Sequence, residues 1–150
     1  MKKAAILMIL LVFLASSCSN ANDDALKAKK IVEYHKKEFE NLPLSGRLAD
    51  GVREINLKAL QFRWEPDTIV VKKGDKVRLI IDNIDAPHGF EIEGVQLQNW
   101  DTNNLMEKGK QYAIEYTADE AGTWDLVCTG YCGPGHAGMR GKYIVKDKRN

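Results

Sequence analysis

The sequence predicts an all-β sandwich preceded by a short N-terminal helix. From residue 54 onward, apolar residues alternate with polar ones, which is the period of a strand with one buried face. These short runs are separated by Gly, Pro, Asn or Asp, and seven strands at such spacing indicate a β-sandwich. Further upstream, apolar residues recur every three or four positions, which predicts a helix.

The first 17 residues have the pattern of a signal peptide. Lys2 and Lys3 precede a twelve-residue apolar run, residues 4–15, and two serines follow it. A membrane-spanning helix needs about 20 apolar residues, so an uncleaved transmembrane anchor is the less favoured alternative. We therefore expect an exported protein that works in the periplasm or at another extracytoplasmic face.

Cys18 is the odd member of three cysteines and stands directly after Leu14-Ala15-Ser16-Ser17. This context is similar to a bacterial lipobox, so we expect Cys18 to be lipidated and to tether the protein to a membrane. Ordinary cleavage, the alternative, would leave a free thiol there. Removal of residues 1–17 takes Lys2 and Lys3 from 22 basic side chains, leaving 20 against 21 acidic ones. A net charge of −1 argues against nucleic acid as a partner.

Residues 18–53 are predicted to form a polar spacer, a helix and a loop. The helix is expected over residues 25–42, where an apolar stripe runs along one face and Pro43 follows. His35 lies on that stripe, so we interpret it as a packing or solvent-facing histidine and not as a ligand. Residues 45–51 are expected to be a loop.

Residues 54–150 are predicted to form the sandwich domain. Ile55, Leu57 and Ala59 share one parity, whereas Phe62 and Trp64 have the other, and this phase slip predicts a β-bulge near Ala59. Six further strands are expected at residues 68–71, 76–84, 90–97, 110–117, 123–128 and 142–146. The aromatic residues predicted to lie mostly in the core are Trp64, Trp100, Tyr112, Tyr116 and Trp124.

Residues 128–139 read Cys-Thr-Gly-Tyr-Cys-Gly-Pro-Gly-His-Ala-Gly-Met. Four of them, Cys128, Cys132, His136 and Met139, carry metal-binding atoms at spacings of four, four and three. Thiolate and thioether are soft ligands and imidazole is intermediate, so this set favours copper over hard cations. The glycines remove side-chain bulk, which lets the backbone fold around a metal.

A closed site needs a second imidazole, and His88 is the candidate because it follows a strand-like run in a predicted end loop. Two thiols on one loop could each contact two copper ions. Three other interpretations stay open: a Cys128–Cys132 disulfide, a mononuclear copper site with one idle cysteine, and a structural zinc site in which Met139 is idle.

The motif His88-Gly89-Phe90, followed forty residues later by Cys-x3-Cys-x3-His-x2-Met, resembles the metal-binding motif of the dinuclear copper A (CuA) domain. That domain occurs in subunit II of cytochrome c and related haem-copper oxidases and at the C-terminus of nitrous-oxide reductases. The resemblance covers residues 60–146 and looks closest to the B-type oxidases. It implies a cupredoxin-like Greek-key sandwich whose metal loop joins the last two strands.

By this resemblance, the cofactor is a pair of copper ions bridged by Cys128 and Cys132. His88 and His136 would each bind one ion. Met139 would be a weak axial ligand, and the backbone carbonyl of Gly130 would complete the set. Many family members carry Glu or Gln at that last position, where glycine keeps the carbonyl but removes the side chain.

The function implied is electron entry into a haem-copper oxidase. Electrons would come from cytochrome c or another small redox protein and leave for a haem-bearing oxidase subunit. That subunit would perform the catalysis, because this chain has no haem-attachment Cys-x-x-Cys-His motif. Family subunits usually span the membrane, whereas a lipid anchor is expected here. A free-standing periplasmic copper lipoprotein that carries electrons, or that stores or delivers copper, is therefore the alternative.

Overall fold

The computed structural model describes residues 23, 25–30, 39 and 41–147. The chain divides into two units, Met1–Phe39 and Glu40–Asn150. Residues 25–30 of the first unit are helical, within the predicted helix of residues 25–42, whereas residues 41 and 42 are not helical. The predicted signal peptide, Cys18 and His35 lie outside the described residues. In the part of the chain that is described, no helix combines the length and apolar character needed to cross a membrane.

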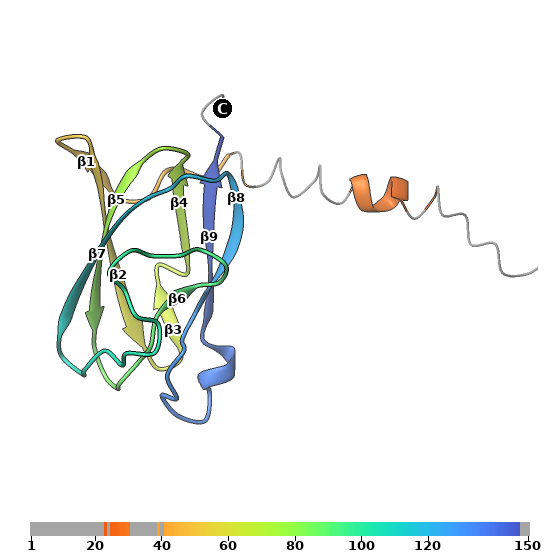
Figure 1. Cartoon of the computed structure of the whole chain (residues 1–150). Helices are drawn as coiled ribbons and strands as arrows, with labels where there is room; N and C mark the ends of the chain where they lie inside the picture. The colour runs from red at the N-terminus through yellow and green to blue at the C-terminus, as the bar shows by residue number, and fades with distance from the viewer. Residues whose placement is uncertain (1–22, 24, 31–38, 40, 148–150) are drawn as a thin grey trace, which may run out of the picture. The chain divides into compact units, whose positions relative to one another are not determined.

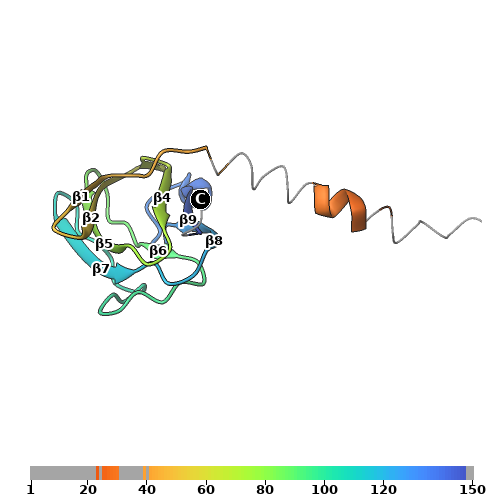
Figure 2. The ribbon, with the colours of Figure 1, turned by 90° about the horizontal axis from the view of Figure 1, so that it is seen from above.

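The second unit contains two β-sheets that pack face to face (Figures 1 and 2). The strand order of the first sheet is β1 (Arg47–Ala49), β2 (Val52–Leu60), β5 (Lys76–Asn83) and β7 (Gln111–Thr117), with β3 (Arg63–Glu65) paired to β2. In this sheet β2 pairs in parallel with β5, and all other neighbours are antiparallel.

The second sheet has four strands, and its β4 and β9 are parallel. The order is β4 (Thr68–Lys72), β9 (Arg140–Lys146), β8 (Gly122–Val127) and β6 (Glu91–Ile92). The predicted all-β sandwich is thereby confirmed. The predicted position of the metal loop is also confirmed, because residues 128–139 connect β8 to β9 and include the short 3-10 helix η1 (His136–Gly138).

The core forms where the inward faces of the two sheets meet. Alternate residues of β2 and β5, such as Leu57 and Leu79, are completely buried against Ile69 of β4 and Leu126 of β8. Each such side chain contributes about 1.5–3 kcal/mol by leaving water. Trp64 is buried, and the aromatic residues Trp100, Tyr112, Tyr116 and Trp124 pack against the core, as predicted.

The predicted β-bulge near Ala59 is wrong, because a hairpin lies there instead. β2 ends at Leu60, the chain turns through Gln61 and Phe62, and β3 returns antiparallel with Ala59 opposite Trp64. Directly opposed residues point to the same face of a sheet. Because the turn has two residues, an odd-numbered residue of β2 lies opposite an even-numbered residue of β3. The buried positions therefore change from odd to even numbers across the turn, which is the phase slip seen in the sequence.

Two further strand predictions need correction. The expected loop over residues 45–51 contains β1, which pairs with β2 through a turn at Asp50 and Gly51. Both turn residues have positive φ, as a tight hairpin turn requires. The strand expected over residues 90–97 shortens to β6, because the chain turns at Gly94, where φ is +80°.

The strand directions bring the ends of several strands to the same end of the sandwich. β2 and β5 are parallel, so Leu60 and Asn83 end together, and Gln61 and His88 follow from that end. β8 ends at Val127, and β9 starts opposite it at Arg140. The backbones of His88 and Met106 pair in an isolated bridge, which brings the segment before β7 to the same place.

Two tyrosines packed between the sheets carry buried hydroxyl groups. The rings of Tyr116 and Tyr143 lie 6.1 Å apart. Neither hydroxyl has a hydrogen-bond partner among the described residues. Burial disfavours the charged phenolate, so it raises the pKa of Tyr143 to about 12 and that of Tyr116 well above its usual value.

We therefore predict that the domain loses stability in alkali. Unfolded tyrosine ionises near pH 10, so a raised native pKa gives stability that is complete below about pH 10 and is lost toward pH 12. At pH 11, Tyr143 should lower the free energy of unfolding by about 1.4 kcal/mol relative to neutral pH. Tyr143→Phe should remove that loss in urea titrations of copper-free protein.

The matched control is Tyr131→Phe, which removes a hydroxyl from an exposed residue. It should follow the wild-type pH dependence. An identical pH dependence for Tyr143→Phe and wild type would contradict the role of the buried phenol.

Candidate metal centre

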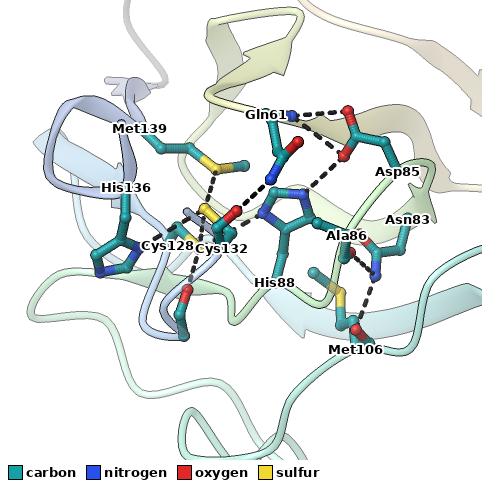
Figure 3. Close-up of polar contacts among 11 residues, drawn as sticks. Gln61, Asn83, Asp85, Ala86, His88, Met106, Cys128, Cys132, His136 and Met139 are labelled. Atoms are coloured by element: carbon teal, nitrogen blue, oxygen red, sulfur yellow. Dashed lines mark hydrogen bonds and ion pairs between the residues drawn. The ribbon is translucent and has the colours of Figure 1, made fainter. Parts of the chain in front are cut away.

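Five side chains predicted to bind metal come together at one end of the sandwich (Figure 3). Four of them belong to the connection between β8 and β9, and His88 belongs to the connection after β5. Cys128 Sγ lies 3.7 Å from His88 Nδ1 and 3.9 Å from Cys132 Sγ. The sequence distance of forty residues between His88 and Cys128 is thus closed by the fold.

The remaining donors divide between the two sulfur atoms. The backbone carbonyl oxygen of Gly130 lies 3.1 Å from Cys128 Sγ. On the other side, His136 Nδ1 lies 3.7 Å and Met139 Sδ 3.8 Å from Cys132 Sγ. Each sulfur therefore has one imidazole and one weaker donor beside it.

These separations fit a bound metal. Bonds of about 2.3 Å to thiolate and about 2.1 Å to imidazole, as zinc makes, place tetrahedral donors about 3.8 Å apart for S···S and about 3.6 Å for S···N. The observed values are 3.9 Å and 3.7 Å. A disulfide would require about 2.05 Å. Cys128 and Cys132 are free thiols, so the disulfide interpretation does not describe this state.

Apart from His136, which is half-buried, the candidate ligand side chains lie almost entirely out of water. His88 is 0% exposed, Cys128 and Cys132 are buried, and Met139 is 1% exposed. Burial, followed by the neighbouring Cys128, raises the pKa of the Cys132 thiol to about 11. In the metal-free protein this thiol is protonated at neutral pH, so a metal must displace its proton to bind.

The His88 ring is held by Asp85, whose carboxylate lies 3.1 Å from Nε2. A proton on Nε2 leaves the Nδ1 lone pair directed at the cysteines, which is the usual carboxylate–histidine arrangement behind a metal ligand. Burial alone would raise the pKa of Asp85, but the backbone N–H of Gln61 and the His88 ring hold it below its ordinary value. The carboxylate therefore remains charged opposite the imidazole.

Gln61 joins the two ligand-bearing connections. Its backbone N–H donates to the Asp85 carboxylate at 2.9 Å, and its side-chain amide donates to the carbonyl of Cys132. Sequence reasoning missed both Gln61 and the role of Asp85. The position of Asp85, three residues before His88, was a signal that could have found it. Gln61 carried none, because it reaches the site only through the β2–β3 turn.

Glycines let the two connections approach each other at backbone distance. A Cβ atom at Gly89 would lie 2.0 Å from Thr129 Oγ1 and 2.6 Å from the Gly130 backbone nitrogen. At Gly130 it would lie 2.0 Å from Leu105 Cδ2, so Leu105 occupies the place of the missing side chain. At Gly135 it would collide with the ring of Phe62.

His88, Cys128 and Cys132 form a buried group whose ligand atoms could hold a metal ion, and the second imidazole and the thioether beside it make the set typical of copper-binding domains built on a two-sheet sandwich. The family model "Cupredoxin-like domain" matches residues 5–145, and the chain belongs to this family.

The curated relatives of the chain include subunits of oxidases. It is 32% identical over 89 residues to cytochrome c oxidase subunit 2 of Thermus thermophilus, covering 59% of this chain and 62% of that protein. It is 36% identical over 70 residues to quinol oxidase subunit 2 of Sulfolobus acidocaldarius, covering 44% of this chain and 39% of that protein. The chain thus spans less than two thirds of these relatives.

Other comparisons agree with the fold. Nitrous-oxide reductase of Ralstonia nicotianae is 32% identical over 80 residues, covering 51% of this chain and 12% of that enzyme. A solved structure of a haem-copper terminal oxidase dimer matches with a TM-score of 0.55 at 23% identity, covering 84% of this chain and 94% of that one. Together the relatives are consistent with a CuA-type cupredoxin domain and imply copper as the metal.

We predict that Gly89→Ala destabilises the copper-free domain by about 1–3 kcal/mol and weakens copper binding, because its methyl group would meet backbone atoms that cannot move aside. The matched control is Gly138→Ala in the metal loop, where a Cβ would have no neighbour within 4 Å. Urea unfolding and copper titration measure the two effects. Equal behaviour of the two variants would contradict the close approach at Gly89.

Proposed function

We propose that the chain is a dinuclear copper electron-transfer protein of the CuA type, which acts as the subunit II-like electron-entry domain of a haem-copper oxidase. The observation that carries this proposal is that four donors lie beside the two cysteine sulfurs, two next to each, which makes six donors in all. Cys128 and Cys132 would bridge two copper ions, and His88, His136, Met139 and the Gly130 carbonyl would supply the remaining ligands.

The donor set supports two ions better than one. A tetrahedral ion takes four ligands. A single ion between Cys128 and Cys132 would use both imidazoles and leave the Gly130 carbonyl and Met139 without a role. Zinc does not use thioether, whereas copper does, so Met139 also favours copper.

The surroundings of the donors support electron transfer over substrate chemistry. Bound copper supplies the redox couple. The protein contributes ligands held from both sheets, a charged Asp85 behind His88 and a pocket that excludes water. Ligands fixed in this way change little between redox states, which favours rapid transfer. We assign oxygen reduction to a haem-bearing partner subunit, because all the proposed copper ligands are groups of the protein itself.

Exposed apolar side chains beside the metal loop support docking of a redox partner. Tyr131 lies between the two cysteines, is 75% exposed, and its ring centroid lies 5.9 Å from that of His136. Leu105, which covers Gly130, is 53% exposed. Apolar surface gathered over a functional site marks an interaction surface. We propose that it receives cytochrome c or another small redox protein as electron donor.

We further propose that the protein is exported and tethered through lipid on Cys18. Residues 1–17 are the proposed signal peptide and residues 18–53 the spacer, helix and loop. The sandwich that follows, residues 54–150 in the sequence-based division, would then reach its partners on the periplasmic or another extracytoplasmic side.

A second function, copper storage or delivery by a free-standing lipoprotein, is favoured by one observation. His136 is only half-buried and adjoins exposed Tyr131, so a recipient could reach its ligand position. Ready transfer of copper to a chelator or recipient protein under physiological redox conditions would support delivery. Co-purification of the chain with a haem-bearing membrane subunit would support electron entry.

We predict that residues 25–150 bind two copper ions per chain. The half-reduced protein should give an electron paramagnetic resonance spectrum split by two equivalent copper nuclei, because the bridging sulfurs share the unpaired electron. Metal analysis and spectroscopy of the same sample measure both quantities. One copper ion with a single-nucleus pattern would exclude the dinuclear centre.

We predict different effects for two substitutions in the loop. Cys132→Ser should abolish or convert the centre, because it removes a bridge. Met139→Leu should retain the metal and shift the reduction potential, because it removes only a weak ligand of similar volume. Absorption spectra and potentiometric titration test the pair. An unchanged spectrum in Cys132→Ser would rule out bridging by that sulfur.

A further inference from the structure

We infer that Asn83 is a positioning residue that determines where His88 meets the two cysteines. Asn83 is the last residue of β5 and is 1% exposed. It does not belong to the proposed ligand set. The part of this inference that concerns copper rests on the proposed function, whereas the part that concerns the His88 backbone does not.

The side chain of Asn83 connects the two segments that flank His88 (Figure 3). Its Nδ2 donates to the carbonyl oxygen of Ala86 at 2.9 Å and to that of Met106 at 2.7 Å. Both partners are acceptors, so the amide nitrogen, and not its oxygen, must face them. The chemistry of the partners thus establishes the orientation of the amide.

Met106 in turn carries the backbone of His88. The Met106 N–H donates to the His88 carbonyl at 2.7 Å, and the His88 N–H donates to the Met106 carbonyl at 3.3 Å. The Met106 carbonyl therefore accepts from both Asn83 and His88. Through Ala86 on one side and Met106 on the other, Asn83 holds the short connection on which His88 stands.

Asn83 is itself firmly anchored. Its backbone N–H donates to the Lys110 carbonyl at 2.9 Å, and its carbonyl accepts from Gly109 N–H at 2.6 Å. It also stands in the parallel register opposite Ala59 of β2. Through these hydrogen bonds, Asn83 fixes the position of the His88 backbone relative to the first sheet.

The amide is present although it leaves a polar atom unsatisfied. Asn83 Oδ1 is buried and has no hydrogen-bond partner among the described residues. A buried acceptor without a partner is unfavourable, and an apolar side chain of similar size would avoid it. A residue that served packing alone would not need the amide, whereas a residue that positions His88 does.

The roles of Asn83 and Asp85 are separate. Asp85 contacts the imidazole and sets the direction of the ring. The Asn83 side chain donates to two backbone carbonyls and fixes the position of the backbone from which the ring projects. The 3.7 Å approach of His88 Nδ1 to Cys128 Sγ requires both.

The test is Asn83→Leu, which keeps the approximate volume and removes the amide. In copper-free protein, hydrogen exchange at the Met106 amide should become about tenfold faster, the scale of one lost hydrogen bond. Amides of the β8–β9 ladder should exchange as in wild type. Asn56→Leu, the same change at an exposed position of β2, is the matched control and should leave Met106 unchanged.

The copper-loaded protein supplies a second measurement that packing alone would not alter. In Asn83→Leu the two copper couplings should become unequal, because only the half of the centre held by His88 is displaced. Wild-type exchange at Met106 together with equal couplings would overturn the inference. If the leucine variant does not fold, Asn83→Ser decides: faster exchange at Met106 supports the role, and wild-type exchange overturns it.

The two proposals fail in different ways. A wild-type protein that binds one copper ion would refute the dinuclear centre but leave the exchange result valid. Normal exchange in the Asn83 variants of a protein with two copper ions would refute only the role of Asn83.

Discussion

The approach of the His88 connection to the Cys128 turn is the constraint on which the rest of the site depends. The metal loop alone supplies two thiols, one imidazole and a thioether, and it lacks a second imidazole. His88 reaches Cys128 Sγ because Gly89 and Gly130 leave no side chains between the two backbones. Polar groups would be costly to bury in such a dry place without partners, and here each ligand has another ligand beside it.

The sandwich makes this contact possible because several strands end at the same end of the fold. The parallel pairing of β2 with β5 places Gln61 beside the connection that starts at Asn83, and the β8–β9 hairpin places the metal loop opposite. Hydrogen bonds then link the parts: Asp85 to His88, Gln61 to Asp85 and Cys132, and Asn83 to the segments around His88. The ligands are therefore oriented by residues that are not ligands themselves.

The surface above the site has a different character from the interior. Most of the candidate ligands are buried, but Tyr131 and Leu105 bring apolar area to the surface beside them. In the proposed function, this arrangement would limit the access of water to the metal and leave a short path for an electron from a docked protein. Leu105 also occupies the place that a side chain at position 130 would take.

Much of the fold and most of the candidate ligand set could be predicted from the sequence, because both depend on local patterns. Strand alternation is a local period of two, and the Cys, His and Met donors lie at short spacings in one loop. The β2–β3 hairpin was misread, since a bulge and a two-residue turn produce the same change of parity. Its correct form matters because Gln61 stands in that turn.

By itself, the sequence determined that this is a β-sandwich with a loop of soft metal ligands, since both properties follow from the order of residues within short segments. Only the tertiary structure decided how the donors divide between the two sulfurs, and which uncharged and acidic residues hold them. Gln61, Asn83, Leu105 and Met106 lie far from the metal loop in sequence. Their roles arise from strand register and backbone hydrogen bonds, which no local pattern records.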